Sequence, residues 1–230
     1  MRAAAKLGAA AGAALLALAA PARAFFDCAA ALVLAMDVSS SVDAREHDLQ
    51  VRGLADALRN EEVIDTILAE GGVMAAAFQW SGWRHQAIMA DWTPLIDRAS
   101  ILAFADAVEA APRAFTRWPT GLGQALGFAA EMHMQNPVTC RRRIVDVSGD
   151  GVNNDGPVPA FFRLRGALDG LTINGLVIRG ATPDPEPHYR EQVIQGPGSF
   201  VIAVESYDDY PPAILRKLLR ELQPPFAAMD

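Results

Sequence analysis

The sequence predicts an α/β fold with a doubly wound, mainly parallel sheet, helices on both faces and one antiparallel edge strand. Three observations support this prediction. Apolar runs along the chain are continuous, as in strands that are buried on both faces of a parallel sheet. Segments with helical spacing separate these runs over the whole length. Polar residues directly follow two of the runs, where ligands of such sheets bind, as in Asp37–Ser41 (DVSSS).

The first 24 residues have the pattern of a secretory signal peptide. Arg2 and Lys6 are followed by an Ala-rich apolar stretch, and Ala22–Ala24 (ARA) matches a small-x-small cleavage site. An uncleaved anchor is the alternative, but a spanning helix needs about 20 apolar residues and this stretch is shorter. We therefore expect export to the periplasm or the extracellular space, and a single domain over residues 25–230.

The composition is acidic, with 20 Lys and Arg residues against 27 Asp and Glu residues. Removal of the signal peptide takes away three basic residues, which leaves a net charge of −10. The chain has no run of basic residues, which argues against a nucleic-acid partner. It also has no later apolar segment that is long enough for stable membrane insertion.

In the N-terminal half, we expect a buried strand over 29–36 and then a helix that ends at Arg59. Asp43 and Glu46 form the capping-box pattern that starts this helix. After a break at Gly71–Gly72, Val73–Trp80 (VMAAAFQW) is a second buried strand. The rest of this half is predicted to hold a short edge strand and two helices: 86–92, 96–111 and 121–134.

The C-terminal half continues the alternation. A strand over 143–148 (RIVDVS) runs into Gly149–Gly151, and the Pro-rich segment 182–187 (TPDPEP) is interpreted as a surface loop. The other elements predicted here are a short helix, a strand, a helical turn, a strand and a final helix: 161–168, 171–178, 189–194, 199–204 and 211–222.

Side chains with oxygen atoms gather after the first strand. Asp37, Ser39 and Ser41 alternate, so an extended or turning segment can direct all three to one side. One carboxylate and two hydroxyls are hard ligands that suit Mg²⁺. The four histidines are scattered, so the spacing of a zinc site is absent. The alternative is that these residues only cap the next helix.

The Asp37-x-Ser39-x-Ser41 pattern resembles the metal-ion-dependent adhesion site (MIDAS) of von Willebrand factor type A (VWA) domains. Those domains complete the site with a threonine from a second loop and an aspartate from a third. Thr120, which opens TGLGQAL, and Asp150, which follows RIVDVS, match them in order. The resemblance implies a Rossmann-like fold over nearly all of residues 25–230. It also implies five ligands for Mg²⁺, or for Mn²⁺ or Ca²⁺, and a partner protein that presents Asp or Glu.

The third loop departs from the family pattern, because Ser-Gly stands before Asp150 where a threonine directly before the aspartate is more usual. The text around CRRRIVDVSGDGVNN, LTINGLVI and VIQGPGSFV is similar to a narrower group of uncharacterised exported bacterial VWA-like proteins. By resemblance, the first strand and the strand before Asp150 are parallel neighbours. Cys28 and Cys140 lie nine and ten residues before Asp37 and Asp150, so we expect a disulfide at the opposite end of the sheet. Two free thiols are the alternative.

Tryptophan and arginine residues flank the matched loops. Both residue types are enriched at binding hot spots, so we interpret these side chains as a rim that contacts the partner. The alternative is that the tryptophans pack under the loops. The predicted rim consists of Trp80, Trp83, Arg84, Arg117 and Trp118.

We expect a binding module rather than an enzyme. Ser148 precedes Gly149 without the earlier glycine of a nucleophile elbow, and no histidine is placed to serve it. Asp37 could mimic a phosphate-accepting aspartate, but Ser39 stands where that chemistry usually has a second acid. The alternatives are a scaffold protein with a silent metal site and, less favoured, a Mg²⁺-dependent phosphoester hydrolase.

Two acidic features near the third loop remain. Asp146 lies inside a predicted strand, and we interpret it as a buried acid paired with an arginine; a role beside the metal ligands is the alternative. The segment Asn153–Gly156 (NNDG) lacks EF-hand spacing, because Val152 stands at the third position, so we interpret it as a turn beside the site.

Overall fold

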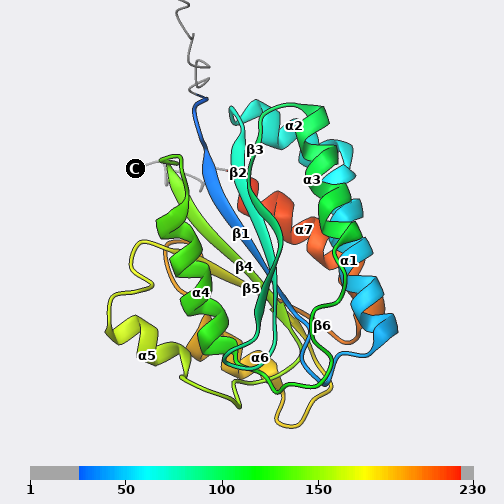
Figure 1. Cartoon of the computed structure of the whole chain (residues 1–230), viewed down its shortest axis with the longest axis vertical. Coiled ribbons are helices and arrows are strands. Elements are labelled where there is room, and N and C mark those ends of the chain that lie inside the picture. The colour runs from blue at the N-terminus through cyan, green and yellow to red at the C-terminus, as the bar shows by residue number, and fades with distance from the viewer. Residues whose placement is uncertain (1–25, 224–230) are drawn as a thin grey trace, which may run out of the picture.

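A computed structural model describes residues 26–223 of the chain (Figure 1). The predicted signal peptide and its cleavage site lie outside this range. None of the helices between residues 26 and 223 combines the length and the hydropathy that a membrane crossing requires.

The centre of the molecule is one six-stranded sheet with the strand order β3-β2-β1-β4-β5-β6 (Figure 1). Every neighbouring pair is parallel except β2 with β3, which is antiparallel and lies at one edge. This arrangement confirms the predicted fold class. The strands are β1 (Ala30–Asp37), β2 (Val73–Trp80), β3 (Gln86–Leu95), β4 (Arg142–Gly149), β5 (Thr172–Ile178) and β6 (Val201–Val204).

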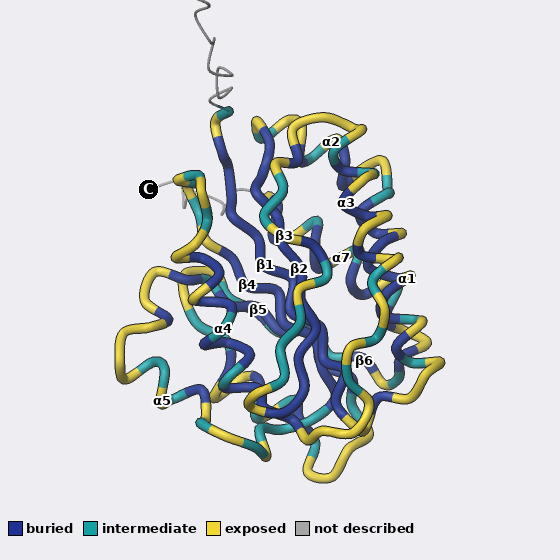
Figure 2. Tube along the Cα trace, in the orientation of Figure 1, coloured by how far each residue is buried: buried dark blue, intermediate teal, exposed yellow. Residues whose placement is uncertain are grey.

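Helices cover both faces of the sheet. Leu32 and Leu34 of β1 pack in a core with α1, α2, α3 and α7, whereas Val33 and Ala35 face a second core with α4. All eight residues of β1 and of β2 are buried, which explains their continuous apolar sequences (Figure 2). The helices are α1 (Ala44–Arg59), α2 (Glu61–Ala69), α3 (Arg98–Ala110), α4 (Leu122–Gln135), α5 (Pro159–Leu164), α6 (Pro185–His188) and α7 (Tyr210–Leu222).

Two short α-helices were not predicted. Helix α2 follows α1 after the single residue Asn60, whose side chain caps α2 by accepting a hydrogen bond from the Glu62 N–H (2.9 Å). Helix α6 occupies part of the segment interpreted as a surface loop, and Asp184 caps it by accepting from the Glu186 N–H (3.0 Å). The prolines that suggested a loop are compatible with a helix start, because the first turn does not need their N–H groups.

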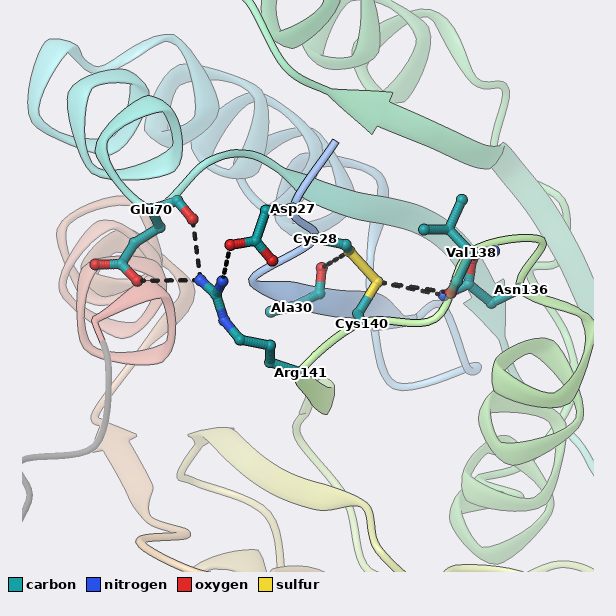
Figure 3. Close-up of a disulfide and its surroundings, with 8 residues drawn as sticks. All are labelled: Asp27, Cys28, Ala30, Glu70, Asn136, Val138, Cys140 and Arg141. Carbon is teal, nitrogen blue, oxygen red and sulfur yellow. Dashed lines mark hydrogen bonds and ion pairs between the residues drawn. A yellow bond between two sulfur atoms is a disulfide. The ribbon is translucent and has the colours of Figure 1, made fainter. Parts of the chain in front are cut away.

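The predicted disulfide joins Cys28 and Cys140 at the amino ends of β1 and β4 (Figure 3). Their Cα atoms are 4.6 Å apart although 112 positions separate them in the sequence. Arg141, next to Cys140, forms an ion pair with Asp27, next to Cys28 (Figure 3). The disulfide therefore links β1 and β4 at one end of the sheet, and the loops that follow Asp37 and Gly149 lie at the other end.

The order of the strands reverses at β1. The chain leaves β1 toward β2 on one side, and it returns to β4 on the other side. Ligands of doubly wound sheets bind beyond the carboxyl ends of the strands at such a switch point. The sheet thus brings the residues after β1 and β4 together at the lower end of Figure 1.

Candidate metal centre

The five predicted metal ligands lie together at the switch point. Asp37 accepts a hydrogen bond from the Ser39 N–H through Oδ1 (2.7 Å), which turns the first loop. The Ser39 Oγ lies 3.2 Å from the Ser41 Oγ and 3.5 Å from the Thr120 Oγ1. The Ser41 hydroxyl donates to the Asp150 Oδ1 (2.7 Å). Three loops that are distant in the sequence therefore meet in one cluster of oxygen atoms.

The Asp37 carboxylate is fully buried, and its Oδ2 atom has no hydrogen-bond partner. Space beside it is kept by Gly149, because a Cβ atom there would lie 2.8 Å from the Asp37 Oδ2. Burial, together with the charge of Asp150, raises the pKa of Asp37 to about 8. A buried, unpaired carboxylate next to a second one is unfavourable without a cation, so the residues present fit a cation at this place.

Only two of the five candidate metal ligands carry a charge. Among residues 26–223, no group of three or more His, Cys, Asp or Glu side chains is arranged to hold a metal ion. The cluster has instead two carboxylates and three hydroxyls. Such oxygen donors suit a hard divalent cation that keeps some of its waters. Four of the donors, Asp37, Ser39, Thr120 and Asp150, are buried, whereas Ser41 is exposed, so the cluster opens to solvent on the Ser41 side.

The first loop is held by a residue that the sequence did not reveal. The Arg113 guanidinium donates to the backbone carbonyl of Val42 (2.5 Å) and is close to the carbonyls of Ser39 (3.3 Å) and Val38 (3.4 Å). Arg113 lies after α3, far from the motif in sequence. No local pattern marks it, because an arginine after a helix is ordinarily solvated.

The segment predicted as a turn beside the site, Asn153–Gly156, contacts the threonine loop and the loop after β2. Asn154 accepts from the Thr120 N–H through Oδ1 (2.8 Å), and its own N–H donates to the Thr120 carbonyl (3.0 Å). Asn153 accepts from the Gly123 N–H (2.7 Å), and Asp155 accepts from the Trp83 N–H (2.9 Å). These contacts hold the threonine loop and the loop after β2 against the loop that carries Asp150.

The predicted rim is exposed at four of its five positions. Trp83 and Trp118 are 41% and 44% exposed, and Arg84 and Arg117 are exposed as well. The Arg84 guanidinium stacks on Trp83 at 4.1 Å from the ring centroid. The Ser40 N–H donates to the Trp118 carbonyl (2.9 Å), so this surface adjoins the loop that follows β1.

The prediction for Trp80 was wrong. Its side chain is fully buried in the core beneath α4, with Phe78 of the same strand. Alternate strand residues share a face, and Trp80 follows Phe78 at a spacing of two. Trp80 therefore packs in the core between the sheet and α4, and its side chain cannot contact a partner.

Asp146 was expected to pair with an arginine. Its Oδ1 atom instead lies 2.7 Å from the Nζ of Lys217, a fully buried lysine of α7. Asp146 is thus a structural acid between β4 and α7.

Two buried tyrosines near the cluster were also not predicted as part of the site. Burial raises the pKa of Tyr189 and of Tyr207, and the charges of Asp37 and Asp150 raise both further. Neither hydroxyl has a hydrogen-bond partner. Both tyrosines come from the C-terminal third of the chain, where the sequence carries no motif that connects them with the metal loops.

Comparison with known proteins identifies a family and structures of the same fold. A model of the family of proteins of unknown function DUF1194 matches residues 27–226. The chain belongs to the DUF1194 family. A search of curated proteins finds no match to this DUF1194 protein.

Solved structures with the same fold are VWA domains. A von Willebrand factor type A protein from Catenulispora acidiphila is 16% identical, with a TM-score of 0.62 over 85% of this chain and 43% of that one. The mussel byssus protein PTMP1, with a zinc-occupied MIDAS motif, is 18% identical, with a TM-score of 0.61 over 86% and 49%. The pilus adhesin SpaC from Lactobacillus rhamnosus GG is 12% identical, with a TM-score of 0.58 over 85% and 31%.

The DUF1194 chain spans less than half of the length of each of these three structures. At such low identity, the likeness establishes the fold. The DUF1194 protein therefore has the VWA fold, and the resemblance to uncharacterised bacterial VWA-like proteins is confirmed.

Proposed function

We propose that this DUF1194 protein is an exported binding module that holds Mg²⁺ at the switch point and uses it to bind an acidic side chain of a partner protein. The observation that carries this proposal is the buried Asp37 carboxylate, whose Oδ2 atom has no partner and faces a space kept open by Gly149. A buried carboxylate in this state needs a cation or a proton.

The chain would hold the cation with Asp37, Ser39, Ser41, Thr120 and Asp150. When bound, the cation supplies an electrophilic position that a carboxylate can occupy. Asp37 and Asp150 bring two negative charges, and the three hydroxyls bring none. A weakly charged donor set leaves a cation able to attract a further carboxylate.

The surface beside the cluster fits a protein partner. Trp83 and Trp118 expose large aromatic areas, and Arg84 and Arg117 add positive charge next to the place where an acidic residue would bind. Tryptophan and arginine are the residue types most enriched at binding hot spots. The VWA fold of a pilus adhesin, and of a mussel protein with a zinc-occupied MIDAS, supports binding as the class of function.

Export rests on the N-terminal sequence, which has a basic start, an apolar centre and a small-x-small end. Binding is favoured over hydrolysis because Ser39 stands where a phosphate-transferring site would have a second acid.

Thermal unfolding tests the metal site. Residues 25–230 contain every described element, and they should melt at a higher temperature in millimolar Mg²⁺ or Mn²⁺ than in EDTA. A ligand at a hundred times its dissociation constant adds about 2.7 kcal/mol, which corresponds to roughly 5–10 °C for a domain of this size.

Two variants make this test specific. Asp37→Asn should lose the rise in melting temperature, whereas Glu131→Gln, an exposed acid of α4, should keep it. No rise in the unmodified protein, or an equal rise in Asp37→Asn, contradicts the metal site and favours a scaffold with a silent motif.

A further inference from the structure

A pocket of about 300 Å³ adjoins the metal cluster on the side that is open to solvent. It shares Ser41 and Asp150 with the cluster, and its other walls come from α1, from the residues after β5 and from those after β6. Its volume is at the lower end of the range for small-ligand sites, about 300–1,000 Å³. The polar side chains that line it are those of Ser41, Glu46, Asp150, Arg179, Glu205, Ser206 and Tyr207.

The only cation in this wall is already neutralised. Arg179 contacts the Asp184 Oδ2 with Nη2 (3.0 Å) and Nε (3.1 Å), and it contacts the Glu205 Oε1 with Nη1 (2.8 Å). The Glu186 Oε2 also lies 3.6 Å from the Arg179 Nε, so three carboxylates surround one guanidinium. Arg179 has little capacity left to attract an anion into the pocket.

Glu46 adds a negative charge that is not compensated. Its carboxylate accepts a hydrogen bond from the Asp43 N–H (2.7 Å), and the neighbouring Arg45 pairs with Asp208 instead. If a cation neutralises Asp150, the two negative charges of Glu46 and Glu205 still exceed the single positive charge of Arg179. The pocket is thus acidic even when the metal site is filled.

A buried hydroxyl in the pocket wall has no partner. Tyr207 is 4% exposed, and its hydroxyl lies near the Asp150 carboxylate without forming a hydrogen bond of normal geometry. A buried polar group without a partner is unfavourable, so a ligand that supplies one is stabilised here. The hydroxyl oxygen can accept a hydrogen bond from an N–H group, which an ammonium or a guanidinium provides.

We propose that this pocket binds a Lys or Arg side chain of the same partner whose Asp or Glu binds the metal. This inference rests on the proposed function and extends it to the partner's sequence. The loop that carries the proposed ligands Ser39 and Ser41 adjoins two unlike surfaces: Ser40 contacts Trp118 of the exposed rim, and Ser41 lines the acidic pocket. The partner segment therefore carries an acidic residue with a basic residue a few positions away on the pocket side.

Selection from random heptapeptides displayed on phage tests the inference. Peptides are captured on residues 25–230 in Mg²⁺ and are eluted with EDTA. The expected pool is enriched in Asp or Glu together with Lys or Arg in the same peptide. An EDTA-eluted pool enriched in acidic residues alone overturns the pocket assignment and leaves the proposed function standing. A pool with no EDTA-dependent peptide contradicts both.

A double-mutant cycle on one selected peptide assigns the basic residue to the pocket. Replacement of the peptide's lysine by glutamine should weaken binding to the unmodified protein about two- to fivefold, as expected for a partly exposed ion pair. The same replacement should have no effect on binding to a Glu46→Gln, Glu205→Gln protein. Glutamine at position 46 keeps the acceptor for the Asp43 N–H, so α1 remains capped.

Two controls complete the cycle. Glu131→Gln, which removes an equal charge from α4, should retain the full effect of the peptide's lysine. The Glu46→Gln, Glu205→Gln protein should keep its rise in melting temperature with Mg²⁺, because neither residue is a proposed ligand. An equal loss from the lysine replacement in all three proteins overturns the inference.

Discussion

Asp37 has an unusual environment for a carboxylate, since it is fully buried, lacks a partner at Oδ2 and lies beside a second acid. Its position was predictable from the sequence, because an aspartate and alternating serines directly follow an apolar strand. The residues that hold the loop after Asp37 and hold Thr120 in place were not predictable from the sequence. Arg113 and Asn154 act through backbone groups of other loops, and such contacts between distant loops leave no local signature.

Asn154 provides a test at the scale of one residue. Asn154→Ala removes the acceptor for the Thr120 N–H, and an unsatisfied buried donor costs about 1–3 kcal/mol. Thr120 then loses its fixed position, so the affinity for Mn²⁺ should fall by about tenfold in a calorimetric titration. Asn154→Asp keeps a side-chain acceptor and should retain more of the affinity than Asn154→Ala.

Asn60→Ala is the matched control for this prediction. It removes the cap of α2, far from the metal loops, and should cost about 1 kcal/mol of stability. It should not change the affinity for Mn²⁺. If Asn154→Ala lowers stability as much as Asn60→Ala does and leaves the affinity unchanged, Asn154 has no positioning role.

At the scale of elements, the strands were predicted best. Strands β1 and β2 were recognisable because every residue in them is buried. Helices α2 and α6 were missed because each is short, and tertiary packing stabilises such helices more than their own sequence does. Lys217 was overlooked as a buried partner of Asp146. Ile214, Lys217, Leu218 and Glu221 share one face of α7 by helical spacing, and that pattern was readable from the sequence.

The contact between α7 and the sheet predicts a pH dependence of stability. Glu221 is buried, with its Oε1 close to the Lys217 Nζ (2.7 Å) and the Asn174 Nδ2 (2.9 Å). Burial and the nearby Asp146 raise the pKa of Glu221 to about 8. The folded state then binds a proton that the unfolded state has released above about pH 4.5. The stabilisation is complete below that pH and is lost as the pH rises through about 8.

Glu221→Gln should remove this contribution. Between pH 5 and 8, the free energy of unfolding of the unmodified protein should fall relative to that of Glu221→Gln, by up to about 1.4 kcal/mol per pH unit. Asp37 titrates in both proteins, so the difference between them isolates Glu221. Urea unfolding at four pH values measures it. Two curves that stay parallel over this range contradict the protonation of Glu221 in the folded state.

In the molecule as a whole, the disulfide and the proposed metal ligands Asp37 and Asp150 lie at opposite ends of β1 and β4. The disulfide joins β1 and β4 across a sequence separation of 112. Cys28→Ser with Cys140→Ser should lower the free energy of unfolding by roughly 4–5 kcal/mol in the chain-entropy model. Urea unfolding with and without a thiol reductant measures this loss. A reductant that leaves the unmodified protein unchanged, while the bridge is shown to be open, contradicts a stabilising role.

The arrangement of the whole chain also explains why the site was predictable. Three loops that each follow or precede an expected element in the right order form a stronger signal than one DxSxS pattern, because aspartate and serine are common in turns. The acidic pocket was not predictable in this way. Its walls come from α1 and from the segments after β5 and β6, and only the folded sheet brings these together.

A crystal structure of residues 25–230 grown with millimolar Mn²⁺ tests the metal site most directly, with the anomalous scattering of manganese measured. We expect one strong anomalous peak among the oxygen atoms of Asp37, Ser39, Ser41, Thr120 and Asp150, and none there in Asp37→Asn. A well-ordered site without a peak, with the Asp37 Oδ2 bonded to a protein group instead, would contradict the metal site and the mode of binding that depends on it.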